Sequence, residues 1–263
     1  MASTSAKWAL VTGATGGLGQ AFCHNLARRG YNIVVTARSE EALAALADAL
    51  RSAHGVEVVA DAADLSQPGA ARQLKAALER RGITVDALVN NAGYGCHGRF
   101  ISHTVEDELG MIDVNIRALT ELCHLFAAEM VKRGGGHILL VASAAAFQPI
   151  PGYAVYAATK AYVLSLGYSL REELRRKNIK VSVLSPGPTE TGFWSRAGHT
   201  LNPLVGSFMM DAQPVAEAGL EALFSGRAGV VPGIANKLAV LTARIFPRSL
   251  LAKGAAYVMS RQK

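Results

Sequence analysis

Three tyrosines and one lysine stand close together in the segment YAVYAATKAY, residues 153–162. Tyr156 and Lys160 are four residues apart, so on a helix their side chains lie on one face and reach a common site. An unperturbed tyrosine loses its proton near pH ~10, and a cation held nearby favours the charged phenolate. The pair can therefore act as a general acid and base, which gives a proton to a carbonyl oxygen or takes one from an alcohol.

The other two tyrosines differ from Tyr156 in their position on this helix. Tyr153 is seven residues before Lys160, which places it roughly on the same face but ~10 Å away along the axis, against ~6 Å for Tyr156. We predict that Tyr153 lies in the wall of a substrate pocket; a purely structural role is the alternative. Tyr162 comes two residues after the lysine, points to another side and is expected to pack.

The segments that must position these residues are short apolar runs that alternate with helical patterns. We predict strands over residues 7–12, 32–37, 56–60, 86–90, 137–143 and 180–185, and helices over residues 18–29, 39–53, 68–81, 106–133 and 153–177. Runs that are apolar throughout, each separated from the next by a helix, indicate a parallel sheet covered on both faces. The predicted fold is a single doubly wound α/β (Rossmann) domain over residues 1–263, with about seven strands and with ligands bound beyond their carboxyl ends.

The first predicted strand leads into a glycine-rich turn, TGATGGLG, residues 12–19. Its glycines, Gly13, Gly17 and Gly19, have the spacing G-x-x-x-G-x-G. Small residues let the backbone approach a pyrophosphate, while the helix that begins here directs free N–H groups at its negative charge. A tight connection between strand and helix, without any ligand, is the alternative for a glycine turn considered alone.

Taken together, the motifs of this sequence resemble those of the short-chain dehydrogenase/reductase family, in the family's order and approximate spacing. They are TGATGGLG at 12–19, DLS at 64–66, NNAG at 90–93, Asn115, Ser143, Tyr156, Lys160 and PGPTET at 186–191. The resemblance runs along most of the chain and is weakest in the C-terminal part, where family members differ with substrate. It implies an enzyme that transfers hydride between a nicotinamide cofactor and a carbonyl or secondary alcohol.

The resemblance also implies roles for individual residues. Tyr156 would be the general acid and base, Ser143 would hold the substrate oxygen, and Asn115 would bend its helix and bind a water in a proton relay toward Lys160. Lowering the tyrosine pKa by ~3 units would require ~4 kcal/mol, which Lys160 and an oxidised nicotinamide could share. The expected cofactor-binding residues are Gly13, Thr15, Gly17, Leu18, Gly19, Arg38, Asp64, Leu65, Asn91, Ala92, Gly93, Tyr156, Lys160, Pro186, Gly187, Thr189 and Thr191. The expected substrate-binding residues are Ser143, Tyr153, Tyr156, Phe193 and Trp194.

Within the cofactor set, the resemblance places Asp64 and Leu65 at the adenine and residues 186–191 at the nicotinamide. Asn90 and Asn91 have a structural alternative, since an Asn at the end of a strand can tie neighbouring backbone together. For Asn90 we prefer that structural role.

The end of the second predicted strand distinguishes the two nicotinamide cofactors. Enzymes for NAD commonly have an acidic residue there for the ribose 2′-OH, whereas an Arg can pair with the 2′-phosphate of NADP. Here Ala37 stands where the acid would be and Arg38 follows it, so we predict that NADP(H) is preferred over NAD(H). Glu40 and Glu41 are the counterargument, but they fall in the first turn of a helix, where the helix dipole favours acids anyway.

A lid of about residues 190–213 follows the nicotinamide motif and is unusually apolar for a connection. Phe193 and Trp194 lie at its start. An apolar lid favours a hydrophobic small-molecule substrate, such as a 3-oxoacyl, aromatic or steroid-like compound. The alternative is that these side chains pack a short pair of helices against each other.

The net charge of +7 is concentrated in the C-terminal part of the chain. From Ala222 to the end there are seven Lys and Arg and no Asp or Glu, so the preceding residues are neutral overall. The high pI therefore does not indicate a nucleic-acid partner. The basic C-terminal segment, about residues 233–263, alternates apolar clusters with Lys and Arg at helical intervals, with a break at Pro247, and is too charged to span a bilayer. It could be a helix docked on the domain, an oligomer contact, or a basic amphipathic surface for membranes or acidic carriers.

Several broader expectations complete the interpretation. The cysteines at 23, 96 and 123 have no metal-ligand spacing, and no metal is expected. The N-terminus lacks the pattern of a signal peptide, so we expect a cytoplasmic protein, and the family resemblance implies a homodimer or homotetramer. The alternative from another functional class is a catalytically idle dinucleotide-binding sensor on the same fold. The complete set of Asn115, Ser143, Tyr156 and Lys160 argues against it.

Overall fold

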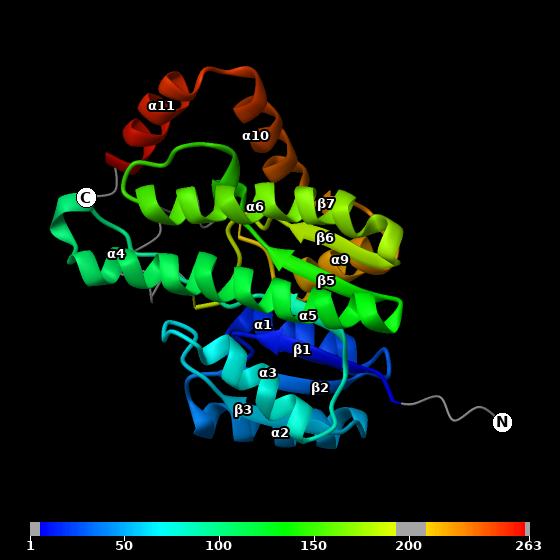
Figure 1. Ribbon diagram of the computed structural model, residues 1–263. Coiled ribbons are helices and arrows are strands. Elements are labelled where there is room, and N and C mark those ends of the chain that lie inside the picture. The colour runs from blue at the N-terminus through cyan, green and yellow to red at the C-terminus, as the bar shows by residue number, and fades with distance from the viewer. Residues whose placement is uncertain (1–5, 193–208, 261–263) are drawn as a thin grey trace.

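The computed structural model of the protein describes residues 6–192 and 209–260. Its centre is a seven-stranded sheet in the order β3-β2-β1-β4-β5-β6-β7, in which every neighbouring pair is parallel (Figure 1). The strands are β1 (Trp8–Thr12), β2 (Asn32–Ala37), β3 (Val58–Ala62), β4 (Val85–Asn90), β5 (Gly136–Val141), β6 (Ile179–Leu184) and β7 (Gly229–Val230). From β1 to β3 successive strands are added toward one edge of the sheet, and from β4 to β7 they are added toward the other edge. In such folds ligands bind at the switch point, here between β1 and β4.

Helices cover both faces of the sheet. On one face lie α1 (Gly17–Ala27), α2 (Glu40–His54) and α9 (Ala212–Phe224). On the other lie α3 (Ala70–Arg80), α5 (Leu119–Arg133) and α6 (Ala154–Leu174). Successive residues of one strand enter opposite clusters: Ala9 and Val11 pack on the first face and Leu10 on the second. This explains why the strands are apolar throughout, and it confirms the predicted doubly wound α/β class.

The predicted third strand is displaced, and the long predicted helix has its expected ends but contains a π-helical segment. The third strand begins at Val58 rather than at residue 56, because the pairing with β2 starts at Ile33 opposite Val58. The residue just before the strand, Glu57, instead donates its N–H to the side chain of Asn32 (3.0 Å). The long helix expected over 106–133 is divided into α4 (Val105–Ile112), a π-helical segment, η2 (Asp113–Ala118), and α5.

The C-terminal part contributes two helices that the sequence analysis did not delimit, α10 (Ile234–Ile245) and α11 (Arg248–Ser260). They stand at one end of the molecule, outside the helices that cover the sheet (Figure 1). The predicted break at Pro247 is confirmed, since Phe246 before it has the extended backbone that a following proline favours. Within residues 6–192 and 209–260, no helix combines the length and the apolar character needed to cross a bilayer.

Candidate active site

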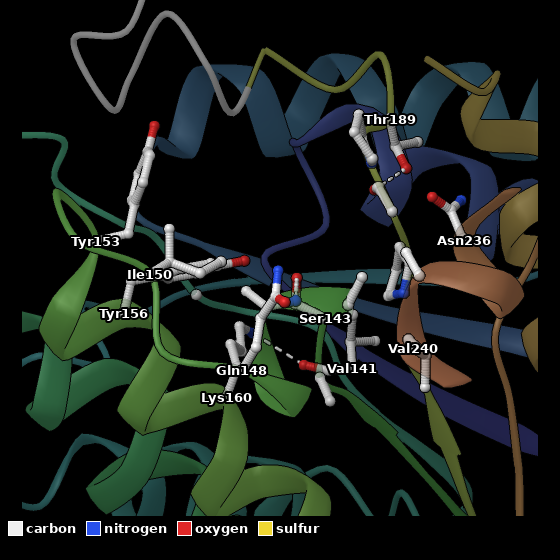
Figure 2. Close-up of a pocket in the computed structure, with 18 of the residues that line it drawn as sticks. Val141, Ser143, Gln148, Ile150, Tyr153, Tyr156, Lys160, Thr189, Asn236 and Val240 are labelled. Carbon is white, nitrogen blue, oxygen red and sulfur yellow. Dashed lines mark hydrogen bonds between the residues drawn. The ribbon is translucent and has the colours of Figure 1, made fainter. Parts of the chain in front are cut away.

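A cavity of about 930 Å³ opens beyond the carboxyl ends of the strands. It is lined by the glycine turn after β1, by the segments that follow β4, β5 and β6, by α6, and by α10 and α11. The elements of the sequence motifs therefore meet at one place, although they are far apart in the chain. Figure 2 shows Tyr156, Lys160 and Ser143 on one side of this cavity and Thr189 and Asn236 across from them.

The glycine turn leaves the N-terminus of α1 open toward the cavity. Gly13 has a positive φ of 62°, and Gly19 packs so closely on the carbonyl of Gly13 that a side chain there would overlap it. A Cβ on Gly17 would lie 2.9 Å from the Cα of Thr191. The helix has no side-chain cap and no acid in its first turn, and residues 16–19 line the cavity. This end of α1 therefore fits the pyrophosphate of a dinucleotide.

A clamp that the sequence analysis did not identify fixes this turn to the end of β4. The Thr12 hydroxyl accepts the N–H groups of Asn91 (3.0 Å) and Ala92 (2.9 Å). In return, the amide of Asn91 donates to the carbonyls of Thr12 (2.9 Å) and Gly13 (3.1 Å). The Asn91 side chain thus has a structural task at the edge of the cavity, while Asn90 is buried and donates to the sulfur of Cys123 (3.2 Å).

Gly93 lies where two candidate catalytic residues approach the backbone. A Cβ on Gly93 would meet the Oδ1 of Asn115 at 3.0 Å and the Nζ of Lys160 at 3.2 Å. Asn115 is fully buried in the π-helical segment. It accepts from the N–H of Tyr94 (3.1 Å) and donates to the carbonyl of Tyr94 (2.9 Å) and the hydroxyl of Thr159 (3.0 Å). Asn115 therefore joins the loop after β4 to α6, next to Lys160.

Ser143, Tyr156 and Lys160 form one polar group in the cavity wall. Burial raises the pKa of Tyr156 to about 12, and a hydrogen bond with Ser143 opposes that rise. Lys160 donates to the carbonyl of Val141 (2.8 Å), and its Nζ lies 5.8 Å from the centre of the Tyr156 ring. Burial lowers the pKa of Lys160 to about 8. In the protein chain without cofactor, burial sets the direction of the shift in the tyrosine pKa. The lowering expected from Lys160 together with an oxidised nicotinamide stays a prediction.

Tyr153 lies at the other end of the same wall, as the N-cap of α6. Its ring is buried, lines the cavity and packs on the rings of His97 (5.0 Å between centroids) and Tyr156 (6.0 Å). In Figure 2 its side chain points in a different direction from that of Tyr156. Tyr162 lies outside the cavity lining and exchanges a hydrogen bond with the hydroxyl of Thr120 (2.9 Å).

The residues expected around the adenosine lie beyond the cavity lining. Arg38 is exposed directly after β2. The hydroxyl of Ser66, which donates to Asp64 (2.8 Å), lowers the pKa of that carboxyl, and the charge of Arg38 acts in the same direction. Leu65 is buried in the core, so its side chain faces away from a ligand. Thr15 is half-buried and is also not part of the cavity lining.

The segment after β6 forms the opposite wall. The hydroxyl of Thr189 donates to the carbonyl of Gly187 (3.0 Å), and the backbone N–H of Glu190 donates to the carbonyl of Met210 (3.0 Å). Gly187 has no room for a side chain because the amide of Asn236, from α10, packs against it. Pro186, Gly187, Thr189 and Thr191 all line the cavity.

Part of the wall was missed by the sequence analysis. Lining residues outside the predicted sets are Gly16, Tyr94, Val141, Gln148, Ile150, Pro188, Ala235, Asn236, Ala239, Val240, Ala243, Phe246, Leu250, Leu251, Gly254 and Ala255, together with Ala142, Ala144 and Ala145. The lining residues on α10 and α11 belong to the basic C-terminal segment. The small residues that recur there at helical spacing were the one feature of the sequence that could have indicated a cavity wall. The predicted Phe193 and Trp194, and most of the predicted lid, lie outside the described residues. In the described part of the chain, no three His, Cys, Asp or Glu side chains are grouped to hold a metal ion.

Known proteins share this sequence pattern. The family model of the short chain dehydrogenases matches residues 7–202. An uncharacterized oxidoreductase of Staphylococcus epidermidis is 36% identical over 191 residues, which are 73% of this chain and 81% of that protein. A very-long-chain 3-oxoacyl-CoA reductase of Danio rerio is 35% identical over 189 residues, which are 70% of this chain and 60% of that protein.

Solved structures share the fold over nearly the whole chain. A short-chain dehydrogenase from Sphingobium yanoikuyae in complex with NADPH has a TM-score of 0.82 and 33% identity, covering 91% of this chain and 93% of that one. A short chain dehydrogenase/reductase from Burkholderia phymatum in complex with NAD has a TM-score of 0.81 and 29% identity, covering 92% and 94%.

The fold and the cavity fit a dinucleotide-dependent oxidoreductase. The matches give the family: the chain belongs to the short-chain dehydrogenases/reductases, which act on alcohol and carbonyl groups.

Proposed function

We propose that the protein is an NADP(H)-dependent oxidoreductase that interconverts a hydrophobic carbonyl compound and its secondary alcohol, with Tyr156 as the general acid and base. The observation that carries this proposal is the hydrogen-bonded group of Ser143 and Tyr156, with Lys160 beside it, in the wall of a largely apolar cavity. When bound, the nicotinamide supplies hydride to the substrate carbon or accepts it.

Tyr156 gives its proton to the carbonyl oxygen during reduction. Its raised pKa means that it is protonated at neutral pH, which is the form that reduction requires. Ser143 donates a hydrogen bond to the same oxygen and stabilises the charge that develops there. The Nζ of Lys160 lies 5.8 Å from the centre of the Tyr156 ring, where its charge acts on the phenol. Asn115 and Lys160 both approach Gly93 closely, and Asn115 acts as a positioning residue for this part of the site.

The residues present fit a dinucleotide along the edge of the sheet. The open N-terminus of α1 would hold the pyrophosphate, and the segment 186–191 would hold the nicotinamide against the other wall. Asp64 and the backbone of Leu65 would lie at the adenine. Asn91 would act indirectly, since its side chain is occupied by the carbonyls of the glycine turn.

Arg38 supports the preference for NADP(H). It is exposed at the end of β2 and close enough to Asp64 to influence that carboxyl. The guanidinium of Arg38 can pair with the 2′-phosphate of NADP, which NAD lacks. The relative bound to NADPH is in line with this choice, whereas the NAD-bound relative shows that the family fold accepts either cofactor.

The hydrophobic substrate is supported by the cavity wall. Its lining includes the large apolar side chains of Ile150, Val240, Leu250 and Leu251. A 3-oxoacyl, aromatic or steroid-like carbonyl compound suits such a wall, and the 3-oxoacyl-CoA reductase of Danio rerio is one relative whose name states a substrate of this kind. The assembly into a homodimer or homotetramer stays a prediction.

The experiment that tests the function is a screen of NADPH oxidation against matched carbonyl compounds. Long-chain, aromatic and steroid ketones should give a higher kcat/KM than sugars and polyol-derived ketones of similar reactivity. A preference for the polyol-derived compounds would contradict the hydrophobic substrate. Cofactor binding without oxidation of NADPH by any carbonyl compound would favour an idle dinucleotide sensor instead.

A further inference from the structure

An exposed aliphatic stripe runs along α10. It consists of Ile234, Leu238, Leu241 and Ile245, which are 78%, 59%, 54% and 70% exposed. Their spacing of four, three and four residues places all of them on one face of the helix. We call this set the α10 stripe. Four large aliphatic side chains in one row are more than the scattered apolar residues of an ordinary protein surface.

The cavity does not use the α10 stripe. The face of α10 that lines the cavity carries Ala235, Asn236, Ala239, Val240 and Ala243, which on a helix lie opposite the stripe. The helix is therefore apolar on two sides, and only one of them is explained by the proposed active site.

Beyond Pro247, α11 also carries exposed apolar side chains, Leu250 and Tyr257. Of these, Leu250 also lines the cavity. The helices α10 and α11 form an outer end of the molecule (Figure 1), where a large flat partner can reach them.

The charge of the two helices is of one sign. Lys237, Arg244, Arg248 and Lys253 are exposed, and the chain has no acidic residue after Glu221. If the same face of a second copy covered the stripe, it would bring positive charge against positive charge. An anionic lipid surface instead offers a hydrocarbon boundary for the aliphatic side chains and phosphate groups for Lys and Arg.

We propose that α10 and α11 bind the surface of a bilayer that contains anionic lipids, with the α10 stripe entering the boundary between headgroups and acyl chains. The same helices line the cavity through Ala239, Leu251 and Gly254, so binding brings the cavity wall next to the lipid. If the proposed function holds, a hydrophobic substrate can then pass between bilayer and cavity with little exposure to water.

Vesicle flotation with the full-length protein, without substrate or cofactor, tests this inference independently of the chemistry. We expect binding to phosphatidylcholine vesicles that contain phosphatidylglycerol, little binding to pure phosphatidylcholine, and release at high salt. The double variant Leu238→Ser/Leu241→Ser and the double variant Lys237→Gln/Lys253→Gln should each lower the partition coefficient by about tenfold or more.

Two matched variants serve as controls. Ile101→Ser removes an aliphatic side chain that is 90% exposed but lies outside the two helices, and Arg72→Gln removes an exposed base on α3. Both should bind vesicles like the wild type, and circular dichroism should show all variants folded. Absence of binding to anionic vesicles, or equal losses in the controls, would overturn the inference. A different result would also overturn it: a wild-type protein that is dimeric and does not bind vesicles, and that Leu238→Ser/Leu241→Ser makes monomeric. A second copy, rather than a bilayer, would then cover the α10 stripe.

Discussion

Gly93→Ala tests whether the close approach of Asn115 and Lys160 to Gly93 sets the catalytic geometry. Gly93 does not have a positive φ, so the substitution leaves the backbone conformation accessible and acts through space alone. The new methyl group would stand 3.0 Å from Asn115 Oδ1 and 3.2 Å from Lys160 Nζ. Ordinary contact begins at 3.4 Å, so the two atoms must retreat by 0.4 and 0.2 Å.

Neither atom can retreat freely. Lys160 is held by the carbonyl of Val141 at 2.8 Å, and Asn115 is held by both backbone groups of Tyr94. Displacing such hydrogen bonds costs about 1–3 kcal/mol, and expressed as a barrier this lowers kcat by roughly 5- to 150-fold. The loss should fall mainly on kcat. Gly93 and Lys160 are also expected cofactor-binding residues, so NADPH binding is measured separately from turnover.

Steady-state kinetics of carbonyl reduction, with NADPH binding followed by fluorescence, measures this effect. Ser52→Ala, an exposed position on α2 outside the cavity lining, is the control. A Gly93→Ala enzyme with the kcat of the wild type would refute the reasoning, because Lys160 and Asn115 would then tolerate displacement.

Three further predictions concern the cofactor, the proton and the wall of the cavity. Arg38→Ala should raise the KM for NADPH about 10- to 100-fold and leave that for NADH nearly unchanged; an unaltered cofactor preference in steady-state assays would contradict the role of Arg38. The kcat of reduction should fall as pH rises through about 8, because Lys160 loses its proton there; a rate that stays constant well above that pH would show that its charge is not needed. Gly187→Ala should displace the Asn236 amide, lower stability by about 1–3 kcal/mol and speed hydrogen exchange in α10. Unchanged thermal unfolding and hydrogen exchange in Gly187→Ala would contradict that packing.

The doubly wound sheet could be predicted from the sequence because its strands are buried on both faces. Ala9, Leu10 and Val11 enter alternate hydrophobic clusters. No polar position therefore interrupts the apolar run, and such a run predicts a buried parallel strand. The edge strand β3 is the exception. It has a neighbour on one side only, and its pattern of burial alternates, so its first residue depended on the pairing with β2 rather than on its own sequence.

The site was predictable where a local spacing carries the geometry. Tyr156 and Lys160 share a helical face, and the structure places Lys160 Nζ over the Tyr156 ring. Thr12 was not predictable in this way, because a threonine in an apolar strand gives no sign of the two N–H groups it accepts from a distant segment.

The cavity wall formed by α10 was hidden for a different reason. Small residues such as Ala239 line the cavity, while large ones such as Leu238 are exposed. A sequence with apolar residues on both faces does not indicate which face is turned inward. The raised pKa of Tyr156 could not be predicted from the sequence either, because the burial that raises it depends on the tertiary structure.

The reductase chemistry assigned to Tyr156 is tested most directly by Tyr156→Phe, which removes only the hydroxyl. With NADPH binding measured on the same samples, we predict a loss of kcat for carbonyl reduction of about 100- to 10,000-fold and an unchanged Kd for NADPH. Substantial turnover in Tyr156→Phe would contradict the central claim that this hydroxyl delivers the proton.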